Sequence, residues 1–154
     1  LGVVRNGAAD VVSLALGRSG DQLKARILLR GKASPKVGYH LSLHAGGKTR
    51  GARYVAAYHW KGSRAEGRVY SHKKTRTLPP ATVRSFLDGS TSTVLAPWPF
   101  EHEPLRFILV RAWTTYGSRA VDQTSVAVLR VSASRGGASE GHASVSAVPT
   151  FAAR

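Results

Sequence analysis

The sequence predicts an all-β protein, built as a two-sheet antiparallel β-sandwich of about nine short strands and followed by a flexible C-terminal tail. Apolar and polar residues alternate with a period of two in most apolar segments, which is the period of a strand with one buried face. Turn-forming residues separate these segments roughly every 8–12 residues. No segment shows the period of an amphipathic helix. These observations favour a sandwich, with a closed β-barrel as the alternative.

The most apolar run, residues 105–116, contains no Gly or Pro and predicts a central strand. β-branched and aromatic side chains dominate this run, which favours a strand over a helix. Its two faces carry Phe107, Leu109, Arg111 and Trp113 on one side and Ile108, Val110, Ala112 and Thr114 on the other. Because both sets are largely apolar, we expect this strand to be covered on both sides.

Eight further strands are expected around the central one. They cover residues 10–16, 22–30, 39–45, 53–60, 65–72, 82–87, 91–96 and 124–131. Gly, Pro, Asp and Ser between these segments predict turns and loops. These include a basic turn at 73–76, an irregular loop at 97–104 and a turn at 117–122.

The length of the chain fits a single domain with a tail. We place the sandwich over residues 1–131, with its core beginning at about residue 9. Residues 132–154 are mostly Ser, Ala, Gly and Val. Such a segment buries too little apolar surface to offset the entropy of ordering it, so we expect a tail or linker there.

Positive charge dominates the composition. Twenty-three Lys and Arg residues face eight Asp and Glu residues, for a formal net charge of +15. The excess is concentrated between Arg18 and Arg76, where the acidic residues are Asp21 and Glu66. A field of this sign attracts phosphate, anionic polysaccharide or acidic lipid surfaces. The alternative is a charge that serves solubility alone.

The absence of cysteine rules out a disulfide framework and a thiolate metal site. No run of about 18 apolar residues predicts a transmembrane helix. The chain also contains no Met. We therefore expect either a secreted protein whose leader has been removed or a fragment of a larger protein.

Two pairs of segments carry a resemblance to a known family. Ala9–Leu14 is followed by Gly20–Ile27, and late in the chain Leu105–Thr115 is followed by a loop and Val121–Thr124. This layout of strands and turns resembles the DOMON-like sandwiches, which include family-nine carbohydrate-binding modules and related extracellular bacterial domains. Members bind sugars or haem, or serve as accessory modules on secreted enzymes. The resemblance implies a non-catalytic extracellular binding module and transfers no ligand residue; the strong positive charge is unlike that of the usual sugar binder.

Aromatic and basic side chains are the candidate ligand-binding residues. Tyr54, Tyr58 and Trp60 share one face of a predicted strand and can stack on sugar rings or bases if that face is exposed. Packing in the core is the alternative for this stripe. Trp98, between two prolines in a loop, is a further stacking candidate. The basic candidates are Lys24, Arg26, Arg30, Arg53, Lys61 and Arg68.

Sequence motifs for catalysis or nucleotide binding are weak. The segment 137–141 matches G-x-S-x-G, but it lies in low-complexity sequence without a following helix. The segment 42–49 is close to a phosphate-binding loop, but it has Ser42 where that loop needs Gly, and no helix follows. We therefore expect no catalytic residues, no cofactor and no enzyme activity.

Metal sites are also not expected. His40 and His44 share the outward face of the strand at 39–45, but they stand about 13 Å apart, too far for one ion. The cluster Glu101-His102-Glu103 lies in a Pro-rich loop and would need ligands from elsewhere. Asp88 and Asp122 are typical turn residues.

The leading hypothesis is a non-catalytic, secreted, extracellular module that binds carbohydrate or an anionic cell-surface polymer. The first alternative is a basic nucleic-acid-binding protein, which charge and aromatic residues alone support. The second alternative is a structural or assembly protein that docks on an acidic partner.

Overall fold

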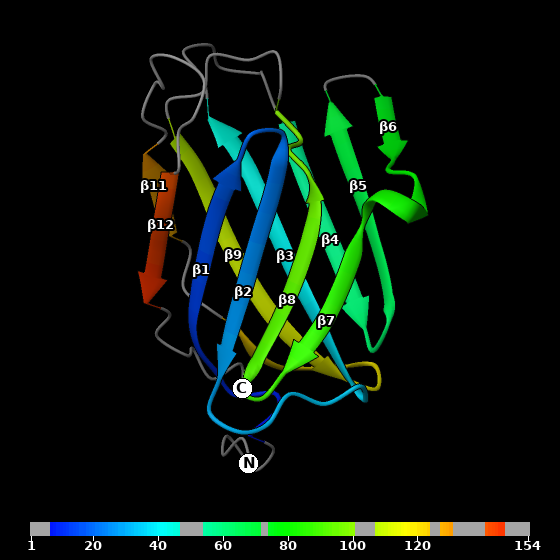
Figure 1. Ribbon diagram of the computed structural model, residues 1–154, viewed down its shortest axis with the longest axis vertical. Helices are drawn as coiled ribbons and strands as arrows, with labels where there is room; N and C mark the ends of the chain where they lie inside the picture. Colours follow the sequence, from blue (N-terminus) through cyan, green and yellow to red (C-terminus); the bar gives the residue numbers. More distant parts are fainter. Residues whose placement is uncertain are drawn as a thin grey trace.

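The computed structural model describes residues 7–46, 54–71, 74–100, 107–123, 127–130 and 141–146. Within these ranges the chain forms twelve β-strands and one short 3-10 turn, Pro80–Thr82. The strands build two antiparallel sheets that face each other (Figure 1). Each sheet ends in edge strands, so the predicted sandwich is confirmed and the barrel alternative is wrong. No helix in the described ranges is long and apolar enough to cross a bilayer.

The five-stranded sheet has the order β12-β1-β2-β8-β7 and lies in front in Figure 1. Its strands are β1 (Val11–Ser19), β2 (Gln22–Leu29), β7 (Arg84–Asp88), β8 (Thr91–Pro97) and β12 (Gly141–Ser146). The hairpin of β1 and β2 turns at Gly20, whose φ of 57° is favourable for glycine.

The seven-stranded sheet has the order β10-β9-β3-β4-β5-β6, and β11 also pairs with β9. Its strands are β3 (Val37–Gly46), β4 (Tyr54–Lys61), β5 (Arg64–Ser71), β6 (Lys74–Thr77), β9 (Phe107–Tyr116), β10 (Arg119–Gln123) and β11 (Ala127–Arg130). The strands β3 and β9 lie far apart in the sequence but pair over their whole length. Together with the pairing of β3 with β4 and of β4 with β5, this places the outer faces of β9, β3, β4 and β5 side by side.

Alternation of buried and exposed residues, clearest in β2, builds the core between the sheets. β2 alternates exposed and buried residues from end to end. The inward side chains of β3 and β4 meet those of β2 and β8. The largest fully buried side chains include Trp60, Tyr39, Tyr58, Leu14, Leu23, Ile27, Leu41, Leu43 and Ile108.

Polar side chains also tie the two sheets together. Trp60 Nε1 on β4 donates to Ser92 Oγ on β8 at 2.7 Å, in a buried position. Asp122 on β10 accepts a hydrogen bond from the backbone N–H of Val11 on β1 at 2.8 Å. The prediction of Asp122 as a turn residue is therefore wrong, because its carboxylate is buried and anchors one sheet to the other. Burial raises the pKa of this carboxyl.

Three segments predicted as turns or tail form strands instead. Residues 74–76 of the basic turn predicted at 73–76 belong instead to β6, whose residues are all exposed. Residues 119–122 of the turn predicted at 117–122 belong to β10, and residues 141–146, expected in a tail, form β12 beside β1. An edge strand needs backbone partners but few apolar side chains, so composition does not reveal it. The remainder of the predicted tail lies outside the described residues.

The central strand β9 has strands on both edges but is not covered on both faces. Ile108, Val110 and Ala112 are buried in the core, as one face of the pattern predicts. On the other face Trp113 is half-buried and Arg111 is exposed. The expectation that both faces are covered is therefore wrong, and this second face forms part of the molecular surface.

Candidate functional site

Two rows of side chains run across the strands on the outer face of the seven-stranded sheet. The first row contains, from β9 to β5, Trp113, His40, His59 and Glu66. The second row lies two residues further along each strand and contains Arg111, Ser42, Ala57 and Arg68. Neighbours in a row are directly opposite each other, where side chains on one face are close enough to touch.

Three rings of the first row form a stack. The ring centroids of His40 and His59 are 4.3 Å apart with an interplanar angle of 26°. Those of His40 and Trp113 are 5.0 Å apart and nearly parallel, at 8°. The Arg111 guanidinium extends the stack, 5.4 Å from the Trp113 ring centroid, and also hydrogen-bonds Gln123 on β10. The result is a row of stacked rings across β9, β3 and β4, which we call the ring wall.

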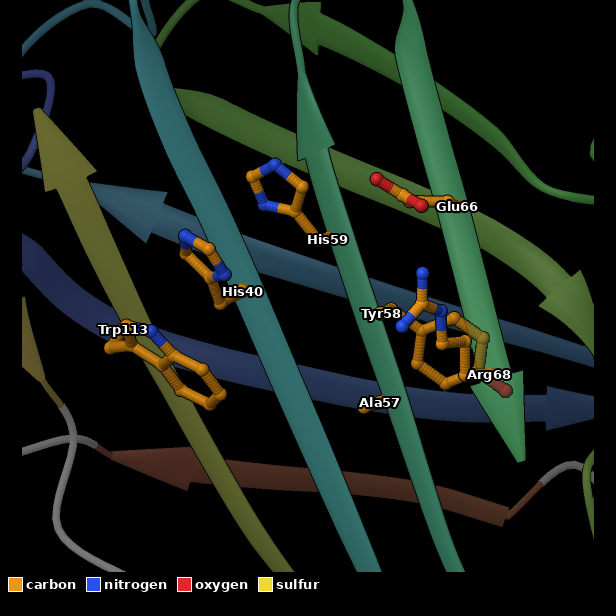
Figure 2. A pocket seen from close by; sticks show the side chains of 7 residues that line it. All are labelled: His40, Ala57, Tyr58, His59, Glu66, Arg68 and Trp113. Atoms are coloured by element: carbon orange, nitrogen blue, oxygen red, sulfur yellow. The ribbon is translucent and has the colours of Figure 1, made fainter. Parts of the chain in front are cut away.

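A hollow of about 300 Å³ opens beside this wall (Figure 2). The residues that line it are His40, Ala57, Tyr58, His59, Glu66, Arg68 and Trp113. The small side chain of Ala57 leaves the space open between the rings and β5. Tyr58 also lines the hollow, although its ring is buried on the core side of the sheet.

His40 is held at the centre of the wall as a neutral ring. Its Nε2 shares a hydrogen bond of 2.9 Å with Thr115 Oγ1 on β9. Gly38 lies opposite Thr115, and a Cβ there would overlap the Thr115 hydroxyl and lie 3.3 Å from His40 Nε2. Glycine at this position therefore makes room for the hydrogen bond. Burial, together with the nearby charge of His59, lowers the pKa of His40 to about 4.

The depressed pKa of His40 predicts a pH-dependent stability. Between pH 6.5 and about 4 the unfolded chain binds a proton at His40 that the folded protein does not bind. The contribution of this group to the free energy of unfolding is fully present above pH 6.5 and is lost as the pH falls through this window, by about 1–2 kcal/mol after discounting for solvent screening of the partly exposed ring. Denaturant unfolding at pH 7, 5.5 and 4 measures the loss, and His40→Gln should flatten it.

The control for this prediction is His44→Gln, which removes an exposed histidine from the same face of β3. We expect His44→Gln to retain the loss of stability that His40 produces between pH 6.5 and about 4. Equal pH dependence of wild type and His40→Gln would contradict the assignment of the loss to His40.

The rim of the hollow on β5 supplies complementary charges. Glu66 and Arg68 are both exposed, point to the same face and stand about 6.6 Å apart along the strand. No ion pair joins them. The guanidinium of Arg68 is free to hold a carboxylate, sulfate or phosphate through two parallel hydrogen bonds. The carboxylate of Glu66 is free to accept hydrogen bonds from hydroxyl groups.

The aromatic residues predicted to stack on a ligand are mostly in the core. Tyr58 is 2% exposed, Trp60 0% and Trp98 6%. Tyr58 and Trp60 occupy alternate positions of β4 that face the other sheet, so core packing, the alternative, holds for them. Trp98 packs edge-on against Phe100 and beneath the Arg18 guanidinium. The stacking role proposed for these three rings is therefore wrong; the side chain of Tyr54 lies outside the described part.

The predicted basic candidates do not form one site. Lys24 and Arg26 are exposed on the outer face of β2, and Arg30 follows the strand, paired with Asp10 at 2.7 Å. Lys61 and Arg68 are exposed on the outer face of the opposite sheet. The alternation of each strand therefore divides these candidates between the two sides of the sandwich.

The remaining candidate, Arg53, lies outside the described residues, as does Glu101-His102-Glu103. Within the described ranges, no group of three or more His, Cys, Asp or Glu side chains is placed to hold a metal ion.

Sequence reasoning missed most of the residues at the hollow. The period-two pattern predicts Trp113 on a covered face, and it does not distinguish His59 or Glu66 from other strand residues. One local signal was present: Arg111 shares its face with Trp113, and a charged residue on a strand usually marks the solvent side. The approach of Trp113 to His40 depends on pairing between β9 and β3, which no local pattern reveals.

Comparison with known proteins gives no relative from which a role for the site could be inferred. The chain matches no protein-family model, no curated protein and no solved structure. The resemblance to DOMON-like sandwiches accordingly rests on the layout of strands and turns alone. The assignment of function depends on the chemistry of the two outer faces.

Proposed function

We propose that this domain is a non-catalytic module that binds an acidic carbohydrate, such as a sulfated or uronic-acid polysaccharide, at the hollow on the seven-stranded sheet. The juxtaposition that supports the proposal is Arg68 and Glu66 beside the ring wall of His40 and His59. An extracellular location is part of the same proposal, since such polymers occur at cell surfaces.

The ligand class follows from the groups available in the hollow. Arg68 suits one anionic substituent of a sugar, and Glu66 suits neighbouring hydroxyls. The rings of His40 and His59 add polar and apolar contacts along one side of the hollow. A neutral glycan would leave Arg68 unpaired, so we expect acidic sugars to bind more tightly than neutral ones.

The absence of catalysis is supported by the carboxylates at the hollow. Hydrolysis of a glycosidic bond ordinarily requires two carboxyl groups on either side of the bond. Among the residues that line the hollow, Glu66 alone carries a carboxyl group. The lining therefore suits binding better than hydrolysis.

The variant Arg68→Gln tests the proposal. We expect it to weaken binding of a sulfated oligosaccharide about 10- to 100-fold, because a hydrogen bond to a charged group contributes about 1.5–3 kcal/mol. The matched control is Arg64→Gln, which removes an exposed arginine from the same face of the same strand, outside the hollow. Calorimetric titration at two salt concentrations measures both variants.

Equal losses in Arg64→Gln and Arg68→Gln would contradict a defined site and leave net charge as the cause of binding. Tight binding of single-stranded DNA with steep salt dependence, and no binding of sulfated sugar, would favour the nucleic-acid alternative.

A further inference from the structure

The outer face of the five-stranded sheet is a second, chemically different surface. The alternation of β2 places Lys24, Arg26 and Leu28 on this face. On β7 the same alternation places Arg84 and Phe86 there. Strand pairing through β8 aligns the two sets: Lys24 and Arg84 share a row, and Arg26 and Phe86 share the next row. We call these five residues the basic–apolar face.

Two large apolar side chains on this face are open to solvent. Phe86 is 44% exposed and Leu28 is 42% exposed. Their Cα atoms are about 12 Å apart, because Phe86 and Leu28 are separated by two strand spacings across the sheet and by two residues along the strand. The other exposed large hydrophobic residues in the described ranges are Tyr116, at 51%, and Tyr70, at 37%, and both belong to the seven-stranded sheet.

The cations around the apolar side chains are not neutralised. Among the described residues, no carboxylate lies within ion-pair distance of Lys24, Arg26 or Arg84. Asp88, at the end of β7, adds one exposed negative charge in the row of Leu28, two strands away across β8. The face therefore keeps a net positive charge, with apolar side chains between the cations.

We propose that the basic–apolar face docks on acidic lipid membranes. Phe86 and Leu28 are placed to enter the boundary between headgroups and acyl chains, while Lys24, Arg26 and Arg84 contact anionic headgroups. Each lysine or arginine near an acidic bilayer strengthens partitioning about fivefold. Buried apolar side chains add binding that charge alone does not supply.

Other occupants of the face fit less well. A second copy of the chain would bring these cations against the same cations in a symmetric contact. An extended polyanion would pair with the cations but would leave the aliphatic side chain of Leu28 without a partner. A membrane uses both kinds of side chain. The inference is independent of sugar binding at the hollow, which lies on the opposite side of the sandwich.

Sedimentation with sucrose-loaded vesicles tests the proposal. The vesicles contain either phosphatidylcholine alone or phosphatidylcholine with about 30% phosphatidylserine, at about 0.1 M salt. We expect binding to the acidic vesicles only. The double variant Phe86→Ser/Leu28→Ser should weaken it about tenfold or more, and Lys24→Gln/Arg26→Gln about 25-fold.

The matched controls lie on the opposite face. Lys61→Gln/Arg64→Gln removes two exposed cations, and Tyr70→Ser removes a large side chain that is 37% exposed. We expect each control to bind acidic vesicles within about twofold of the wild type. Melting temperatures confirm that every variant is folded; the substituted side chains are all exposed, so folding should be retained.

Two results would overturn the proposal. One is the absence of binding to acidic vesicles by the folded wild type. The other is equal binding by wild type and Phe86→Ser/Leu28→Ser, because that result would make the attraction purely ionic. Sugar binding at the hollow is tested separately, by the loss of sulfated-sugar binding in Arg68→Gln. The two proposals can therefore fail independently.

Discussion

Replacement of Trp60 by alanine is expected to destabilise the domain by about 3–5 kcal/mol, the largest loss for any single substitution considered. The indole is fully buried between the sheets and lies 6.1 Å, centroid to centroid, from the ring of Tyr39. Its Nε1 also donates to Ser92 on the opposite sheet. The substitution removes the packing of a large side chain and a bond between the sheets together.

Denaturant unfolding of Trp60→Ala and Ser92→Ala separates these two contributions. Ser92→Ala keeps the indole but leaves its buried N–H without an acceptor, which should cost about 1–3 kcal/mol. A Trp60→Ala variant with wild-type stability and lost sugar binding would contradict the core assignment. That result would return Trp60 to the role of a ligand platform.

The second large effect is expected for Gly67→Val on β5. Gly67 lies opposite Tyr58, and a Cβ there would lie 2.9 Å from two atoms of the Tyr58 ring and 3.0 Å from Leu78. Glycine is therefore required by the close approach of the ring. Because the neighbours are part of a packed core, we expect a loss of about 3 kcal/mol despite the higher strand propensity of valine.

A second substitution checks the cause of this loss. In a Tyr58→Leu background the ring is absent, so Gly67→Val should cost less than it does in the wild type. The difference is the coupling energy of a double-mutant cycle, measured by denaturant unfolding. Additive losses in the double variant would contradict the close approach as the cause.

Local patterns in the sequence are sufficient to predict the fold class. Strands such as β2 alternate so regularly that their buried faces are readable from the residues alone. The edge strands β6 and β12 are not predicted from these patterns; both join their sheets by backbone pairing, and every residue of β6 is exposed. Strand order and register depend on long-range pairing, which a local period does not encode.

The candidate site was only partly predictable for the same physical reason. Arg68 was identified from its charge, and His40 was correctly expected to face outward. The other residues of the hollow include His59 on β4 and Trp113 on β9. The register of β3 with β4 and with β9 places both of them opposite His40. The error with Trp60 arose because an aromatic stripe on a strand has the same pattern in the core as on the surface.

The most direct test of sugar binding at the hollow is an NMR titration of the wild-type domain. A sulfated oligosaccharide and its unsulfated counterpart are added in turn, and side-chain resonances are followed. We predict that the sulfated sugar shifts the signals of His40, His59, Arg68 and Trp113, with much weaker shifts from the neutral sugar. Shifts confined to the basic–apolar face, or the absence of shifts with either sugar, would contradict binding at the hollow.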